Sequence, residues 1–364
     1  MKKLLVITSK PNEEIIEKEN NLKTTNKPYT RQKKILDKLQ STFPDQTFMV
    51  RDDSISDMRK YLNECCIVDE QYLEFLENAY TNFVNNGENP EYISPYDGGL
   101  INYHFSKKNI MVPSDLPYYL QCGIYGDDLC TSIFSYTYES SLKSTINCIA
   151  ASEILSNNSL NEIFKKYIGN DIIYCLNVFP GHHATHCSYS GYCFLNNAAI
   201  CAQLLSQTHD LVAILDLDFH HGDGTQKIFY KNNCILTISI HGDPNNNYPF
   251  YSGYENEHGK YEAVGYNINY ALKNGCGKDE YIKTLTDALS IINRYKIDVL
   301  VIAFGADTCM NDPEGNFGLG IDDYLLVGQL IKSQINVPMV VTQEGGYCMD
   351  VVDMVVTNFL NGLL

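Results

Sequence analysis

Residues 211–226 read LVAILDLDFHHGDGTQ. The opening run, Leu211–Leu217, is apolar enough for a strand that is buried on both faces of a parallel sheet. Three aspartates and two histidines nevertheless lie within or directly after this run. Because ionised carboxylates are costly to bury without a compensating positive charge, the stretch is either a surface turn or a strand end that holds a cation.

The second half of the chain repeats a pattern of strand, loop and helix. Four further apolar runs rich in Val and Ile predict buried strands: Ile172–Val178, Cys234–Ile240, Asp298–Phe304 and Pro338–Thr342. Between them, Tyr281–Tyr295 and Ile321–Ile335 have the spacing of helices. Alternating strands and helices predict an α/β domain with a parallel sheet.

The first half is harder to divide. Leu4–Ile7 predicts a first strand, and we expect Pro28–Arg31 to be a loop that leads into a helix at Gln32–Leu39. Residues 85–119 are polar, rich in Gly, Pro and Tyr, and long for a connection, which favours a binding loop, a lid or an interaction segment. No repeat or linker marks a second domain, so residues 1–364 are expected to form one domain with this loop inserted.

Composition narrows the class of protein. The 364 residues include 27 basic and 44 acidic side chains, for a net charge of −17. This balance argues against a nucleic-acid partner, which needs clustered Lys and Arg, and would attract a cationic substrate. The 13 cysteines are scattered without a CxxC pair, as expected of reduced thiols in a cytoplasmic protein. No apolar run approaches the roughly 20 residues of a membrane span, and Leu4–Ile7 is too short for a signal sequence.

Polar loops follow the predicted strands at their carboxyl ends. Besides the loop after Leu217, these are PGHHA (180–184), SIHGDP (239–244), AFGAD (303–307) and QEGGY (343–347). In an open parallel sheet the carboxyl ends meet at one edge, and ligands bind there. Five loops with glycine and a chemically useful side chain therefore predict one site.

Two carboxylates and one imidazole form the predicted metal site. Asp218 and His220 are two residues apart, which points both side chains to the same side of a strand end. Asp307, at the end of another strand, completes the set. Three protein ligands with an open fourth position are typical of catalytic zinc, although Fe²⁺, Mn²⁺ and Co²⁺ accept the same donors.

Other side chains of these loops suit acid–base chemistry. His182 and His183 carry imidazoles that exchange protons near neutral pH. Asp216 and Asp223 flank the metal loop, and each would accept an N–H from one histidine and so orient it. Tyr347, on a glycine turn, would donate a hydrogen bond to a developing oxyanion opposite the metal.

Together with GYCFLNNAAIC (191–201) and GADTCMNDP (305–313), these motifs resemble the zinc-dependent histone deacetylase superfamily, most closely its bacterial acetylpolyamine amidohydrolases. The resemblance extends over residues 120–364 and, loosely, over the first 50. It implies an arginase/deacetylase fold with an eight-stranded parallel sheet flanked by helices. The implied reaction is hydrolysis of an N-acetyl amide on an alkylamine.

The resemblance also implies roles for individual residues. Asp218, His220 and Asp307 would hold one Zn²⁺; His183 would be the general base and acid, and His182 its electrostatic partner. Tyr347 would polarise the acetyl carbonyl. Asp216 and Asp223 would be partners of the two histidines. The implied substrate-binding residues are Gly191, Tyr192, Tyr248, Glu314 and, by a looser match, Asp128. The implied ligands of a structural K⁺ ion are Asp216, Asp218, His220, Ser239 and Ile240.

Glu314 bears on the choice of substrate. Many lysine deacetylases of the superfamily have an apolar residue there, whereas its polyamine-specific eukaryotic member resembles this chain in carrying glutamate. Such a carboxylate would pair with a second ammonium of a polyamine, which an acetyl-lysine peptide lacks; a solvated glutamate in a turn is the equal alternative. The bacterial relatives also dimerise through an early inserted loop. Residues 85–119 do not match its sequence, so a homodimer through them is a hypothesis.

Acetylpolyamine deacetylation is therefore the first interpretation, and deacetylation of acetyl-lysine in proteins is the alternative. An arginase-like dimanganese enzyme is disfavoured, because Gly222 stands where that family has a second-metal aspartate. A non-catalytic binder of acetylated or basic ligands is the remotest alternative, because the ligand set, His183 and Tyr347 are all present.

Overall fold

A single parallel sheet organises the computed structural model, which describes residues 3–49, 58–106, 113, 115–156 and 162–364. Its strand order is β2-β1-β3-β8-β7-β4-β5-β6, and all the pairings are parallel. The strands are β1 (Leu4–Thr8), β2 (Thr47–Met49), β3 (Ile172–Leu176), β4 (Val212–Asp216), β5 (Ile235–Gly242), β6 (Asn267–Leu272), β7 (Val299–Phe304) and β8 (Met339–Gln343). Seven have at least five residues, and the edge strand β2 has three. The α/β fold with a parallel sheet is confirmed.

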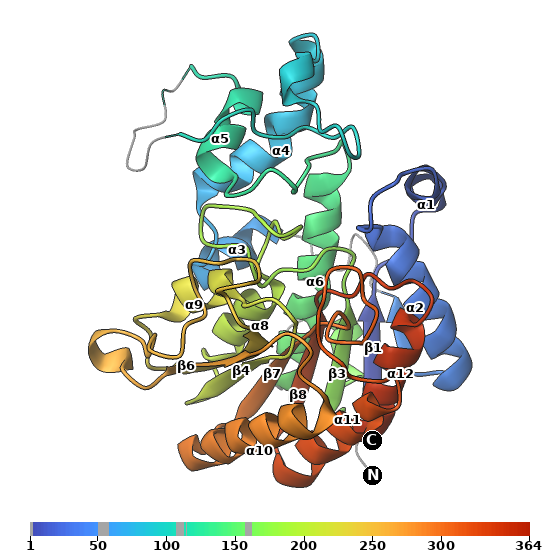
Figure 1. The fold of residues 1–364 in the computed structure, drawn as a ribbon, viewed down its shortest axis with the longest axis vertical. Coiled ribbons are helices and arrows are strands. Elements are labelled where there is room, and N and C mark those ends of the chain that lie inside the picture. Colours follow the sequence, from blue (N-terminus) through green and yellow to red (C-terminus); the bar gives the residue numbers. More distant parts are fainter. Residues whose placement is uncertain (1–2, 50–57, 107–112, 114, 157–161) are drawn as a thin grey trace.

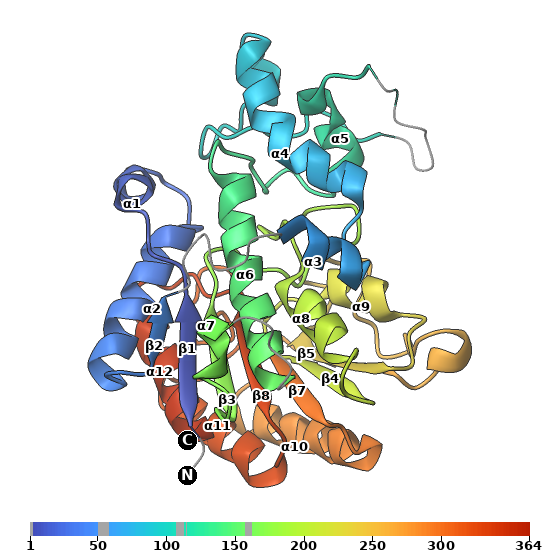
Figure 2. The ribbon, with the colours of Figure 1, turned by 180° about the vertical axis from the view of Figure 1, so that it is seen from behind.

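Helices cover both faces of the sheet (Figures 1 and 2). One core contains side chains of α2 (Pro28–Thr42), α10 (Lys278–Tyr295), α11 (Asp323–Gln334) and α12 (Val352–Leu363). The other contains side chains of α1 (Glu13–Asn20), α3 (Met58–Cys65), α4 (Glu70–Asn85), α5 (Cys122–Tyr125), α6 (Thr137–Leu155), α7 (Glu162–Lys165), α8 (Asn197–Leu205) and α9 (Asp223–Phe229). Short 3-10 turns are η1 (Pro90–Tyr92), η2 (Tyr118–Gln121) and η3 (Tyr261–Ala263).

Successive residues of β4 alternate between the two cores. Val212 and Ile214 belong to one, whereas Ala213 and Leu215 belong to the other. Because both faces are covered, every position of this strand is buried. This explains why the strand reads as a continuous apolar run up to Asp216.

The expected loop at Pro28–Arg31 is instead the first turn of α2. Pro28 suits the first helical position, where the missing N–H is no loss. The cap comes from Glu19 of α1, whose carboxylate accepts hydrogen bonds from the N–H groups of Tyr29 at 3.0 Å and Thr30 at 2.8 Å. A cap supplied by another helix leaves no local sequence signal.

The described part of residues 85–119 runs from the last residue of α4 into η2, at the top of the view in Figure 1. Leu100 forms isolated bridges with Ile93 and Ile133, so part of this segment is tied to the rest of the chain. Its residues 107–112 and 114 lie outside the described residues. The homodimer through this segment stays a prediction. No helix in the described ranges has both the length and the apolar character that crossing a bilayer requires.

Candidate metal centre and active site

The predicted site residues leave the sheet at the ends of neighbouring strands. His182 and His183 follow β3, Tyr347 follows β8, Asp307 follows β7 and Asp218 follows β4. These four strands are consecutive in the sheet order. Residues from widely separated parts of the sequence therefore meet at one edge.

Asp218, His220 and Asp307 form a compact group in which one potential ligand atom of each lies within 4.8 Å of the others. The Nδ1 atom of His220 lies 3.3 Å from Asp218 Oδ1 and 3.2 Å from Asp307 Oδ2. The second oxygens are held by the backbone, since Gly345 N–H donates to Asp218 Oδ2 at 2.8 Å and Phe219 N–H to Asp307 Oδ1 at 3.0 Å. One oxygen of each carboxylate thus faces the imidazole.

This group fits a divalent cation. Burial and the adjacent Asp218 carboxylate raise the pKa of Asp307 to about 7, so a nearby positive charge favours the state in which both carboxylates are ionised. A Cβ at position 345 would lie 2.4 Å from Asp307 Oδ2 and 2.6 Å from Asp218 Oδ2, so Gly345 keeps the space beside both carboxylates open. The nitrogen and oxygen donors suit Zn²⁺ and the similar divalent ions.

The tandem histidines each pair with a different aspartate. His182 Nδ1 lies 3.0 Å from Asp216 Oδ2, and His183 Nδ1 lies 2.7 Å from Asp223 Oδ1. Both histidine side chains are almost fully buried. Each aspartate therefore fixes the orientation of one imidazole and leaves its Nε2 free for other contacts.

The pKa values of these histidines shift in opposite directions. Burial lowers the pKa of His183, and the nearby His182 and His220 lower it further. Burial also opposes the charging of His182, but the carboxylates of Asp218 and Asp216 raise its pKa well above the usual value. The arrangement therefore favours a cationic His182 beside a neutral His183, which is the protonation state of a general base.

Tyr347 lies at the same edge and is 8% exposed. Burial raises the pKa of its phenol far above the usual value, so the hydroxyl keeps its proton as a hydrogen-bond donor. Its ring centroid lies 5.8 Å from that of Tyr192 and 5.9 Å from the guanidinium carbon of Arg31. Arg31 is buried and donates to the backbone oxygens of Val178 at 3.2 Å and Gly346 at 3.5 Å. Sequence reasoning missed Arg31 because it was expected in a loop.

Two predicted substrate-binding residues contact His183. Gly191 has a φ of 53°, and a Cβ there would lie 2.2 Å from His183 Cδ2, so only glycine fits. The ring centroid of Tyr248 lies 4.9 Å from that of His183. Asp128 connects Gly191 with Tyr248. Its Oδ2 atom accepts a 2.6 Å hydrogen bond from Gly191 N–H and lies 3.5 Å from the Tyr248 hydroxyl.

Three carboxylates at the rim of the site, those of Glu314, Asp128 and Asp97, act on the phenol of Tyr192. Burial, followed by the negative charges of Glu314, Asp128 and Asp97, raises the pKa of this phenol. Glu314 accepts a hydrogen bond from the hydroxyl of Thr25. In the described part of the chain, none of the three carboxylates pairs with a lysine or arginine. The rim therefore has negative charge that no such ion pair neutralises.

The residues predicted to hold a structural cation lie on β4, β5 and the metal loop. Asp216 and Ser239 line the same small cavity, of about 10 Å³, and Ile240 is the next residue of β5. The Ser239 hydroxyl is 2.8 Å from His241 Nδ1. The structure thus brings Asp216 and Ser239 together beside the metal group.

Two buried carboxylates that sequence reasoning missed hold the reactive loops. Glu344 Oε2 accepts hydrogen bonds from the N–H groups of Gly181 at 2.6 Å and His182 at 3.1 Å. Asp312 Oδ2 accepts one from Tyr347 N–H at 2.8 Å. A signal was present in each case, because an acidic residue directly follows a buried strand or lies in a glycine- and proline-rich loop of the site.

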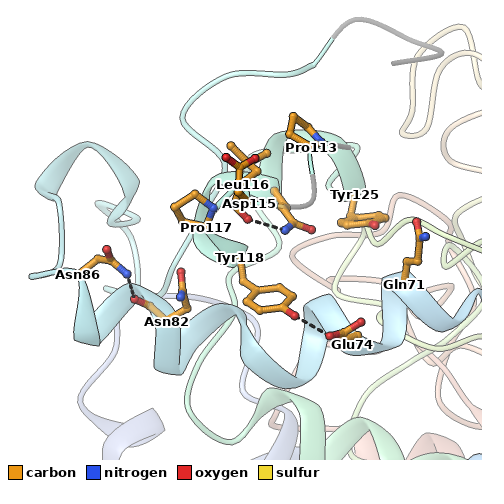
Figure 3. Close-up of a pocket in the computed structure, with 11 residues that line it drawn as sticks. Gln71, Glu74, Asn82, Asn86, Pro113, Asp115, Leu116, Pro117, Tyr118 and Tyr125 are labelled. Atoms are coloured by element: carbon orange, nitrogen blue, oxygen red, sulfur yellow. Dashed lines mark hydrogen bonds between the residues drawn. The ribbon is translucent and has the colours of Figure 1, made fainter. Parts of the chain in front are cut away.

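A cavity of about 580 Å³ lies elsewhere, between α4 and the segment that leads into α5 (Figure 3). Polar side chains line it, among them Glu74, whose carboxylate accepts a 2.6 Å hydrogen bond from the Tyr118 hydroxyl. None of the predicted metal-binding or catalytic residues lines this cavity. The chemistry of the side chains, not the size of a cavity, therefore locates the site.

Comparisons with known proteins show the family and the fold of the chain. Residues 27–363 match the model of the histone deacetylase domain. The chain is 35% identical over 297 residues to acetylpolyamine amidohydrolase 1 of Pseudomonas aeruginosa, covering 81% of this chain and 80% of that protein. It is 33% identical over 296 residues to acetylpolyamine amidohydrolase of Mycoplana ramosa, covering 81% of each. The crystal structure of acetylpolyamine aminohydrolase from Burkholderia pseudomallei matches with a TM-score of 0.82 and 26% identity, over 98% of both chains.

Proposed function

This chain belongs to the histone deacetylase family of hydrolases, and on that premise we propose that it removes acetyl groups from acetylpolyamines. The observation that carries the proposal is the meeting of the Asp218–His220–Asp307 group with His183 and Tyr347 at one sheet edge. The names of the two amidohydrolase relatives support the class of substrate.

The proposed chemistry assigns each group a task. Asp218, His220 and Asp307 would hold Zn²⁺, which when bound supplies a Lewis acid for the amide carbonyl and the attacking water. His183 takes a proton from that water and returns it to the leaving amine nitrogen. Tyr347 donates a hydrogen bond to the oxygen on which negative charge develops.

The neighbours of these groups support the same reaction. Asp223 orients His183, so that Nε2 is the atom that exchanges the proton. Asp216 holds His182, whose positive charge stabilises negative charge beside the metal group. Both imidazoles are buried, which strengthens the electrostatic effect of the two pairings.

The substrate would lie between aromatic walls. Tyr192 and Tyr248 would contact its methylene chain, with Gly191 and Asp128 fixing the position of the walls. The Glu314 carboxylate would pair with a distal ammonium group. The net charge of −17 favours the approach of such a cation.

We further propose that K⁺ binds beside the metal group, with Asp216, Asp218, His220, Ser239 and Ile240 as its ligands. Support comes from the small cavity that Asp216 and Ser239 share. The expected outcome is that replacing K⁺ by tetramethylammonium lowers the thermal midpoint of the protein, and that Ser239→Ala makes the midpoint insensitive to this exchange. Equal midpoints of the wild type in both salts would contradict the proposal.

The test is side-by-side turnover of the zinc-loaded protein on N-acetylputrescine, N8-acetylspermidine and an acetyl-lysine peptide. We expect kcat/KM to be at least tenfold higher for a polyamine, about 1.4 kcal/mol of transition-state discrimination. A preference for the peptide would instead establish the alternative, a protein lysine deacetylase. Binding of all three without turnover would favour a non-catalytic binder.

A further inference from the structure

We propose that Asp312 is a positioning residue that holds Tyr347 in its reactive place, and this rests on the proposed function. The carboxylate accepts hydrogen bonds from two successive backbone N–H groups, those of Tyr347 and Cys348, each at 2.8 Å. The same side chain accepts a third from Glu314 N–H at 3.0 Å. One carboxylate thus joins the loop of the phenol to the turn of the rim glutamate.

Burial makes these hydrogen bonds the main partners of the carboxylate. Asp312 is 6% exposed, and no lysine or arginine within the described ranges pairs with it. A buried carboxylate needs its charge matched, and three backbone N–H groups do so here. Breaking this arrangement would leave both the acid and the amides of the loop after β8 without partners.

The loop that carries Tyr347 depends on such an anchor. Gly346 has a φ of 122°, a conformation that glycine adopts without strain but that does not itself fix the next residue. On the other side of the loop, Ala306 N–H donates to the carbonyl of Gly345 at 3.0 Å. Asp312 is therefore the residue that binds the backbone N–H of Tyr347 itself. A misplacement of a catalytic group by about 1 Å can cost roughly 100-fold in rate.

The two sets of hydrogen bonds predict two different kinetic effects of Asp312→Asn. Asparagine keeps the shape of the aspartate side chain. Its NH2 group, however, is a donor and takes the place of one of the two carboxylate oxygens that accept from backbone N–H groups. Because Tyr347 would be misplaced, kcat is expected to fall at least tenfold on both N8-acetylspermidine and an acetyl-lysine peptide. Because the turn of Glu314 would also be less well held, KM is expected to rise for N8-acetylspermidine. It should not rise for the peptide, which lacks a distal ammonium.

A double-mutant cycle tests whether Asp312 acts through Tyr347. Wild type, Asp312→Asn, Tyr347→Phe and the double variant are compared in kcat, zinc content and thermal midpoint. We expect Asp312→Asn to change kcat less than twofold in the Tyr347→Phe background, because the hydroxyl that it positions is absent. Zinc content should stay at the wild-type level in all four proteins.

The outcomes separate this inference from the proposed function. The role of Asp312 would be overturned if the two decreases in kcat multiply in the double variant, or if Asp312→Asn keeps the wild-type kcat. Either result would leave the proposed deacetylation intact. Absence of turnover by the wild type would overturn both. Should Asp312→Asn fold poorly, Asp312→Glu provides a second carboxylate variant for the same cycle. Asp69→Asn is the matched control, since Asp69 also accepts two backbone N–H groups, those of Gln71 and Tyr72, at the start of α4.

Discussion

The hydroxyl of Thr25 donates a hydrogen bond of 2.5 Å to the carboxylate of Glu314, although the two residues are 289 positions apart. Thr25 lies between α1 and α2, and Glu314 lies in the loop after β7. The contact brings the beginning of the chain to the rim of the site. It also limits the orientations of the carboxylate that would receive a distal ammonium group.

We expect Glu314→Ala to lower kcat/KM at least tenfold more on N8-acetylspermidine than on an acetyl-lysine peptide, because only the polyamine carries the distal charge. Thr25→Val should act in the same direction with a smaller effect, since it frees the carboxylate without removing it. Steady-state kinetics on both substrates measure this. Thr24→Val is the control, because its hydroxyl contacts the N–H of Asn26 instead. Equal losses on the two substrates would rule out the role of Glu314 in selectivity.

Tyr347→Phe is expected to lower kcat by roughly 100- to 1000-fold, the usual effect of removing one donor to a developing oxyanion. Bound zinc should be unchanged, because the phenol is not among the metal-binding side chains. Turnover and metal analysis of the same preparation test both statements. Turnover near the wild-type value would mean that another group stabilises the oxyanion.

Asp223→Asn should reduce kcat about 10- to 100-fold, because the amide no longer stabilises the His183 tautomer that leaves Nε2 as the base. Stopped-time assays on acetylputrescine measure the loss. Asp210→Asn, at an exposed position before β4, should keep the wild-type rate. A similar kcat in both variants would show that His183 does not need its aspartate.

Removing the metal with a chelator should abolish turnover and lower the thermal midpoint, and added Zn²⁺ should restore both. The physical reason is that an ion bound only by the folded state stabilises that state. Burial of Asp307 beside Asp218 adds a cost to ionisation that the ion removes. Asp307→Asn should weaken the response of the midpoint to Zn²⁺, as measured by thermal denaturation at increasing zinc concentration. An unchanged response would place the ion elsewhere.

Glu19→Ala should reduce the free energy of unfolding by about 1 to 2 kcal/mol, the typical effect of losing a helix cap. Its carboxylate is the side chain that caps α2, from which Arg31 extends to the Tyr347 loop. Urea denaturation measures the change. Glu17→Ala is the control. Glu17 is exposed on α1, the helix that also carries Glu19, and its loss should change the free energy of unfolding by less than about 0.5 kcal/mol. Equal effects of the two substitutions would argue against capping by Glu19.

The sequence predicted the buried strands of the sheet better than its edges. The β4 run is apolar because both faces are covered, so composition alone reveals it. Strand β6 was missed, since Asn267 and Asn269 interrupt its apolar pattern. Both asparagines are buried and donate to the side-chain oxygen of Gln226, at 2.7 and 2.8 Å. Such a polar network depends on a partner that is distant in sequence, so local patterns do not indicate it.

The site was predictable where one motif carries the chemistry, as in the Asp218–His220 pair. Asp216 and Asp223 were likewise predicted as partners of the histidines, whereas Asp312 and Glu344, which hold the loops in place, were not. Asp312 and Glu344 accept hydrogen bonds from backbone N–H groups of other loops. Almost any residue can supply such an N–H group, so the contact does not restrict the type of residue that donates. The sequence around Tyr347 or His182 therefore does not indicate which carboxylate accepts from its backbone, and the only signal is the position of the acidic residue in its own loop.

The order of the strands has a consequence for how the molecule assembles. Strand β8 is the last of the described strands along the chain, yet it lies in the middle of the sheet, between β3 and β7. Because β8 pairs with both of them, it joins β2-β1-β3 to β7-β4-β5-β6, and without it these would be two separate groups of strands with open edges. The distance between the catalytic loops after β3 and β7 therefore depends on β8. Any state in which β8 is unpaired is therefore expected to be inactive, because the site needs loops from both groups of strands.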